Sequence, residues 1–260
     1  CRRGIGGRPP RAITQDSMIP SGSQPSSARA IFFDVDFTLI FPGPTFQGEG
    51  YARFCAEQGI TVARECFEDA VAAASFILDD VEEPIYDAAL FVHYTATIIE
   101  QMGGRGPAVV RAAERIYEQW AGNHHFEMYD DVAPVLTTLA SRGFTLGVIS
   151  NSHRSLEAFK EHFRLESLIT TTVSSAEHGY MKPHRSIFER ALMQASVPAG
   201  NAVMVGDSLK ADIEGALAAG MRAVLLRRSG EVPASLPPGV TVIRSLTELL
   251  EHVDAAGFKR

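Results

Sequence analysis

The sequence is short of cysteine, of basic residues and of long apolar runs, and each shortage excludes a class of protein. Its three cysteines, Cys1, Cys55 and Cys66, form no C-x-x-C pair, which excludes a disulfide framework and a thiolate zinc site and favours a reducing compartment. The sequence contains no uninterrupted run of roughly 18 apolar residues, so no segment of it could span a bilayer. The 31 acidic residues outnumber the 24 basic ones, which argues against a nucleic-acid partner. We expect a soluble, cytoplasmic protein, and the sequence indicates no oligomeric state.

The N-terminal segment, residues 1–29, is rich in Arg, Ser, Pro and Gly and shows no apolar periodicity. Such a composition cannot bury enough apolar surface to fold, so we predict a disordered tail. Because the chain begins with Cys1 and Met18 follows later, residues 1–17 can be interpreted as a translated overhang. The Arg-rich, acid-poor composition also suits an organelle transit peptide, so both interpretations stay open.

Residues 30–45 and 126–258 alternate short apolar runs with helical patterns. This alternation is typical of βαβ units, so we predict an α/β core with a doubly wound parallel sheet and helices on both faces. The strands are expected at Ala30–Val35, Phe144–Ser150, Ile169–Val173, Ala202–Gly206, Ala223–Leu226 and Val240–Ile243, and the helices at Val132–Ser141, Ser155–Phe163, Ser186–Ala195, Lys210–Ala219 and Leu246–Val253.

The alternation stops between residues 46 and 125, where apolar residues recur only at helical spacing. The helical segments are Tyr51–Gln58, Ala63–Leu78, Glu83–Met102 and Val109–Ala121. We therefore predict an inserted, all-helical cap domain over residues 46–125. Its entry, Phe41–Pro44, combines two prolines with a glycine, which suits a turn or hinge.

The first candidate site follows the first expected strand, in the run Asp34-Val35-Asp36-Phe37-Thr38. Residues i and i+2 of an extended chain face the same way, so the carboxylates of Asp34 and Asp36 should converge at one strand tip. An aspartate is ionised at neutral pH and can attack phosphorus without a base to activate it. We predict Asp34 as a nucleophile and Asp36 as the group that handles the proton.

A second acidic group follows the strand expected at Ala202–Gly206, with Asp207 directly after it and Asp212 at the start of a helix. Hard divalent cations such as Mg²⁺ take oxygen ligands, and one or two carboxylates suffice. We predict Asp207 as a metal ligand and Asp212 as a residue that orients it. Helix capping with an incidental acid is the alternative.

Two further segments lie at the same edge of the expected sheet. Ser150 and Asn151 end a strand, where a hydroxyl and backbone N–H groups can hold phosphate oxygens or merely cap a helix. Lys182 precedes a helix. Open α/β sheets bind ligands at this edge. Four carboxylates would repel a phosphate monoester, so we expect a divalent cation together with Lys182 to balance the charge.

In their order along the chain, these four segments resemble the motifs of the haloacid dehalogenase superfamily, and the helical insertion resembles its smaller cap. The resemblance implies a Mg²⁺-dependent phosphohydrolase that acts on a small phosphorylated metabolite through an aspartyl phosphate on Asp34. Asp36 would be acid and then base, and Lys182 would neutralise charge at the nucleophile. Phosphate would be bound by Thr38 and Ser150, and the metal by Asp34, the Asp36 carbonyl and Asp207.

Two departures and two alternatives accompany the resemblance. The superfamily usually has Gly at the position of Phe37 and often Asn at that of Ala211, so we expect Phe37 to narrow the pocket mouth or slow turnover. A 2-haloacid dehalogenase would not need Asp36, and a non-catalytic regulatory protein would not need the complete acid set. His153 and Arg154, directly after the second motif, are interpreted as surface residues of a first helical turn, with contact to the substrate as the alternative.

Overall fold

The computed structural model describes residues 29–79, 81–254 and 257–258. Its larger part is a six-stranded parallel sheet in the order β5-β4-β1-β6-β7-β8. The strands are β1 (Ala30–Phe33), β4 (Thr145–Ser150), β5 (Ile169–Ser174), β6 (Ala202–Gly206), β7 (Arg222–Leu226) and β8 (Thr241–Ile243). All six lie where the apolar runs predicted them. Except for Arg29, the tail predicted to be disordered lies outside the described residues.

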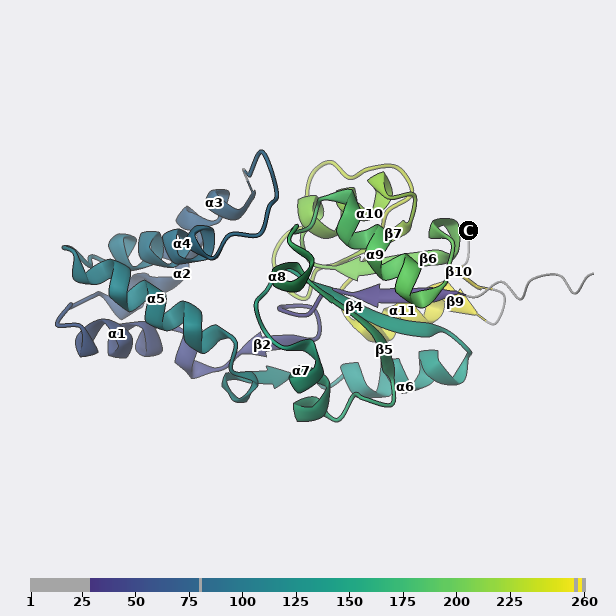
Figure 1. Cartoon of the computed structure of the whole chain (residues 1–260), viewed down its shortest axis with the longest axis horizontal. Helices are drawn as coiled ribbons and strands as arrows, with labels where there is room; N and C mark the ends of the chain where they lie inside the picture. The colour runs from purple at the N-terminus through teal and green to yellow at the C-terminus, as the bar shows by residue number, and fades with distance from the viewer. Residues whose placement is uncertain (1–28, 80, 255–256, 259–260) are drawn as a thin grey trace, which may run out of the picture.

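Helices cover both faces of the sheet (Figure 1). On one side lie α6 (Val132–Ser141), α7 (Leu156–Phe163) and α11 (Leu246–His252), and on the other lie α9 (Arg185–Ala195), a π-helical segment (Leu209–Glu214) and α10 (Gly215–Ala218). Successive side chains of the central strand β1 point into the apolar cores on the two faces of the sheet. Ile31 and Phe33 lie in one core, and Ala30 and Phe32 lie in the other. The predicted doubly wound parallel sheet is therefore confirmed.

The short remaining elements of the core connect or follow these layers. They are α8 (Ser175–His178), a 3-10 turn (Ala199–Asn201) and a small hairpin of β9 (Val253–Asp254) and β10 (Gly257–Phe258).

The helical insertion follows the first strand and projects from one side of the core (Figure 1). Its helices are α1 (Gly48–Glu57), α2 (Phe67–Ala74), α3 (Phe76–Asp79), α4 (Ala88–Gln101) and α5 (Ala108–Trp120), with 3-10 turns at Pro44–Phe46, Arg64–Cys66 and Asn123–His125. Buried Tyr51, Ile99 and Ile116 belong to the apolar cluster that continues into the sheet. The insertion is confirmed, whereas its limits as a domain, residues 46–125, stay a prediction.

A two-stranded antiparallel ribbon joins the insertion to the core, where the sequence predicted only a turn or hinge. Strand β2 (Ile40–Pro42) pairs with β3 (Phe126–Met128), and the Gly43 N–H donates to the His125 carbonyl at 2.8 Å. The partners are far apart in the sequence and three residues each, so local periodicity could not reveal them. Pro42 is tolerated in β2 because both strands of a two-stranded ribbon are edge strands, where proline does not break an inner ladder of hydrogen bonds.

The predicted helix over Ala63–Leu78 is two helices, α2 and α3, separated at Ser75. The Ser75 hydroxyl donates to the Ala72 carbonyl at 2.9 Å, a local bond that competes with the helical pattern.

A loop of the insertion also contacts the core, in the segment between β5 and α9. The Met181 N–H donates to the Pro84 carbonyl at 2.7 Å and the Tyr86 N–H to the Gly179 carbonyl at 3.0 Å. These bonds hold the insertion against the segment that leads into Lys182.

Among the described helices, none has the length and apolar character needed to cross a membrane.

Candidate active site

Three neighbouring strands of the sheet end at the candidate site. Asp34 follows β1, Ser150 ends β4 and Asp207 follows β6, and these strands are adjacent in the order β4-β1-β6. The Asp34 N–H donates to the Val205 carbonyl at 2.9 Å, which fixes the first carboxylate against the neighbouring strand. Parallel strands thus bring residues from three distant parts of the sequence to one edge.

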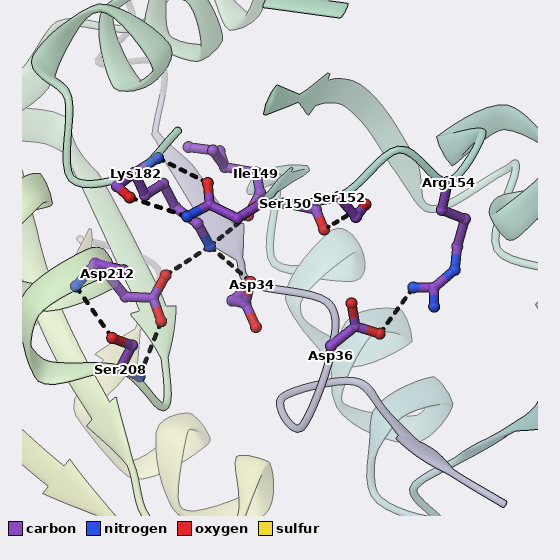
Figure 2. A network of polar contacts seen from close by, with 11 residues as sticks. Asp34, Asp36, Ile149, Ser150, Ser152, Arg154, Lys182, Ser208 and Asp212 are labelled. Carbon is purple, nitrogen blue, oxygen red and sulfur yellow. Dashed lines mark hydrogen bonds and ion pairs between the residues drawn. The ribbon is translucent and has the colours of Figure 1, made fainter. Parts of the chain in front are cut away.

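Lys182 lies at the centre of this group, 4% exposed. Its Nζ donates to Asp34 Oδ1 and Asp212 Oδ1, both at 2.6 Å, and to the Ile149 carbonyl at 2.8 Å (Figure 2). All three donors of the ammonium group are therefore used.

The Asn151 side chain holds the backbone of Lys182 in place. Its Nδ2 donates to the Lys182 carbonyl at 2.9 Å, and its Oδ1 accepts from the Lys182 N–H at 2.7 Å. The sequence predicts that Asn151 binds the substrate. The structure assigns both ends of its amide to Lys182, and a contact with substrate stays a prediction.

Burial and crowding shift the protonation equilibria of the site. Burial raises the pKa of Asp34 and Lys182 lowers it, but the Asp212 charge adds to the rise, and the result is a pKa of about 7. Burial, with the charges of Asp34 and Asp212, also raises the pKa of Asp207 well above its ordinary value. For Lys182, burial alone would lower the pKa, yet the two adjacent carboxylates raise it overall. The single positive charge of Lys182 therefore does not balance the negative charges of these three carboxylates.

Asp34, Asp207 and Asp212 each offer a carboxylate oxygen, and the three oxygens lie within 4.8 Å of one another. Oxygen donors of this kind suit a hard divalent cation, and an added positive charge would counter both the burial and the carboxylate repulsion that raise the pKa of Asp34. The residues present therefore fit such a cation. Asp212, predicted to orient the metal, is held by Lys182 and by the Ser208 N–H at 3.0 Å.

Asp36 lines the same cavity as Asp34 and pairs with a buried arginine. Arg154 Nη1 donates to Asp36 Oδ1 at 2.8 Å (Figure 2). Its Nη2 donates to the Trp120 carbonyl, at the end of α5, at 3.1 Å. Arg154 is 1% exposed, so its interpretation as a surface residue is wrong. In the sequence Arg154 lies shortly after the second motif, but only the fold brings its guanidinium group to Asp36.

Phe37 has a left-handed backbone, with φ at +62°. For a residue other than glycine this conformation costs roughly 1–2 kcal/mol, which gives a physical reason why glycine is usual at this position of the resembled motif. The side chain is 46% exposed and lines the catalytic cavity, which has a volume of about 280 Å³. Phe37 thus stands at the mouth of the site.

Thr38 is not among the residues that line the catalytic cavity. It is fully buried, its Oγ1 has no hydrogen-bond partner in the described part of the chain, and its carbonyl accepts from Arg228 Nη2 at 2.9 Å. Ser150 does line the catalytic cavity, and its Oγ donates to Ser152 Oγ at 3.0 Å. Of the two predicted phosphate-binding hydroxyls, Ser150 is the one placed at the cavity.

Because Gly206 has no side chain, the Asp212 carboxylate can lie directly against its backbone. A Cβ at this position would lie 2.3 Å from the Asp212 carboxylate. We expect Gly206→Ala to displace Asp212 from Lys182 and to lower the free energy of unfolding by about 1–3 kcal/mol, measured by urea denaturation. The control is Gly200→Ala, where an added Cβ meets nothing within 4 Å. Equal stability of the two variants would contradict the close fit at Gly206.

Comparison with known proteins identifies the family. A model of the haloacid dehalogenase-like hydrolase family matches residues 88–226. N-acylneuraminate-9-phosphatase of Mus musculus is 30% identical over 253 residues, covering 88% of this chain and 96% of the relative. The chain belongs to the haloacid dehalogenase-like hydrolase family. The resemblance drawn from the four motifs is thereby confirmed.

Other members of the family show how widely the likeness extends. Glyceraldehyde 3-phosphate phosphatase of Methanothermobacter thermautotrophicus is 27% identical over 208 residues, covering 76% of this chain and 85% of its own length. The solved structure of 2-haloacid dehalogenase from Pseudomonas syringae has a TM-score of 0.58 and 29% identity, and the match covers 86% of this chain and 97% of that one. The proteins similar to this chain thus include both a phosphatase and a dehalogenase.

Proposed function

We propose that this protein is a magnesium-dependent phosphomonoesterase that acts on a small phosphorylated metabolite through a phosphorylated Asp34. The observation that carries the proposal is the buried contact of Asp34 with Lys182 at the end of the central strand, beside two further carboxylates. The relatives named for phosphatase activity support it. A cytoplasmic location, and the absence of nucleic-acid and membrane partners, stay predictions.

The reaction has two steps that use the same carboxylates. Asp34 Oδ2, the oxygen that Lys182 does not contact, forms a bond to phosphorus while the ester P–O bond breaks, and the leaving oxygen takes a proton from Asp36. Water then attacks the phosphorus, Asp36 accepts a proton from it, and the carboxylate of Asp34 and inorganic phosphate are released. Ser150 and Lys182 stabilise the negative charge.

Asp36 can serve this role while it remains paired with Arg154. Arg154 donates to Oδ1, and the other carboxylate oxygen faces away from the guanidinium (Figure 2). That oxygen is the one we assign to the proton. Arg154 would then hold the carboxylate as a positioning residue, without contact with the reacting atoms.

Mg²⁺ would be held by Asp34, the Asp36 carbonyl and Asp207, and when bound it would polarise the phosphoryl group and offset the charge of the acids. We expect chelation with EDTA to reduce phosphate release from a panel of monoesters to background, and added Mg²⁺ to restore it. We also expect Mg²⁺ at about one hundred times its Kd to stabilise the fold by about 2.7 kcal/mol, visible as a rise in Tm.

The matched control is Asp207→Asn, which should lose most of this rise in Tm because one ligand carboxylate is gone. Equal hydrolysis with and without EDTA would contradict the metal requirement. No phosphate release from any monoester under either condition would contradict the proposed function.

A 2-haloacid dehalogenase is the second candidate, favoured by the 29% identity to the enzyme from Pseudomonas syringae. In that reaction Asp34 would attack carbon and displace halide, and Asp36 would not be needed. Halide release from 2-chloropropionate, with no phosphate release from the monoester panel, would favour this candidate.

A further inference from the structure

A second cavity lies between the insertion and the loops that follow β1 and β4 of the core, and it adjoins the catalytic cavity. Its volume is about 320 Å³. The two cavities share six lining residues, Asp36, Phe37, Leu78, Phe91, Tyr94 and Asn151. The organic part of an ester whose phosphorus lies at Asp34 would therefore extend past Phe37 toward this second cavity, which we call the cap cavity.

Aromatic side chains from four helices of the insertion, and from the turn before them, line the cap cavity. They include Phe46, Tyr51, Phe67, Phe91, Tyr117 and Trp120. An apolar cavity of about 150 Å³ is already large enough for benzene, so the cap cavity has room for one or two rings. Ring faces and edges of this kind favour an aromatic or other bulky apolar ligand.

The side chains that line the cap cavity disfavour an anionic ligand group, because the nearby cation, Arg154, is already paired with Asp36. Among the described residues that line it, none is lysine or arginine, and Asp36 is the acid present. His153 also lines it, and burial together with the charge of Arg154 lowers the pKa of its imidazole. A carboxylate placed here would lose its hydration without gaining a cationic partner, which is costly.

We propose that the substrate is a phosphate monoester of an uncharged aromatic or bulky apolar alcohol, with the organic group in the cap cavity and the phosphate beside Asp34 and Lys182. This inference rests on the proposed function for the hydrolytic step. The binding part can be tested without it.

Hydrolysis of matched esters tests the choice of organic group. Benzyl phosphate, its 4-carbamoyl derivative and its 4-carboxy derivative share the same leaving oxygen, and the last two differ mainly in charge. We expect kcat/KM of the first two to exceed those of the 4-carboxy ester and of glucose 6-phosphate at least about tenfold. Equal or higher values for the 4-carboxy ester or glucose 6-phosphate would overturn the inference while leaving the phosphatase function intact.

Binding of benzylphosphonate, which cannot be hydrolysed, gives a readout that does not depend on turnover. Trp120 is the single tryptophan of the sequence and lines the cap cavity, so occupancy should change its fluorescence. We expect benzylphosphonate to change the emission of the Mg²⁺-loaded protein and to bind at least about tenfold more tightly than methylphosphonate. Equal binding of the two, or unchanged emission at saturation, would overturn the inference.

A variant that fills the cap cavity provides the structural control. Val71 lines the cap cavity but not the catalytic cavity, so Val71→Phe should weaken benzylphosphonate at least about tenfold and leave methylphosphonate unchanged. If the larger side chain of Val71→Phe prevents folding, Val71→Leu provides a smaller change. It should give a smaller loss of benzylphosphonate affinity. The control is Val110→Phe in α5, where Val110 is 50% exposed, and this variant should bind both phosphonates normally. Unchanged benzylphosphonate binding by folded Val71→Phe and Val71→Leu would overturn the assignment to this cavity.

Discussion

Asp34→Asn is expected to lower kcat for phosphate release at least about a thousandfold, because a neutral amide cannot replace the carboxylate that forms the bond to phosphorus. The fold should persist. An asparagine oxygen can still accept the bond from Lys182 Nζ, and Lys182 keeps its second carboxylate partner, Asp212. The measurement is steady-state phosphate release with Mg²⁺ present, together with a urea denaturation curve.

The matched control for this variant is Asp69→Asn, an exposed acid in the first turn of α2. It makes the same chemical change at a distance from the site, so turnover should stay within about twofold of the unsubstituted protein. Turnover by Asp34→Asn similar to that of Asp69→Asn would remove Asp34 from the role of nucleophile.

Lys182→Met is expected to lower both stability and turnover. The ammonium group is buried and bonded to Asp34 and Asp212, and removing one partner of a buried ion pair costs about 3–5 kcal/mol because the other charge is left uncompensated. Turnover should fall at least about a hundredfold, since a positive charge beside the nucleophile is lost. Urea denaturation without divalent cations measures the first effect, and phosphate release with Mg²⁺ measures the second.

Mg²⁺ distinguishes charge compensation from simple packing in this variant. If the loss arises from uncompensated carboxylates, added Mg²⁺ should recover part of the lost stability. The control is Lys160→Met, which breaks the ion pair with the exposed Glu157 at 2.8 Å and should cost no more than about 1 kcal/mol. A loss of stability no larger in Lys182→Met than in Lys160→Met would contradict the buried network.

Local sequence signals were sufficient for the core and for the main acidic groups. Each strand of the sheet was visible as a short apolar run, and Asp34, Ser150 and Asp207 were placed at strand ends by counting along the chain. Since parallel strands share one edge, their meeting also followed from the sequence. The helical insertion was visible for the same reason, because periodicity is a local property.

The contacts that complete the site depend on residues far apart in the sequence. The fold buries Arg154 against Asp36, and it places the Asn151 side chain against the backbone of Lys182. Neither contact follows from the local sequence pattern. The β2–β3 ribbon and the adjoining cavities arise in the same way. Periodicity and spacing report on neighbours along the chain, whereas pairing, burial and cavity shape depend on the packing of segments that the chain brings together from a distance.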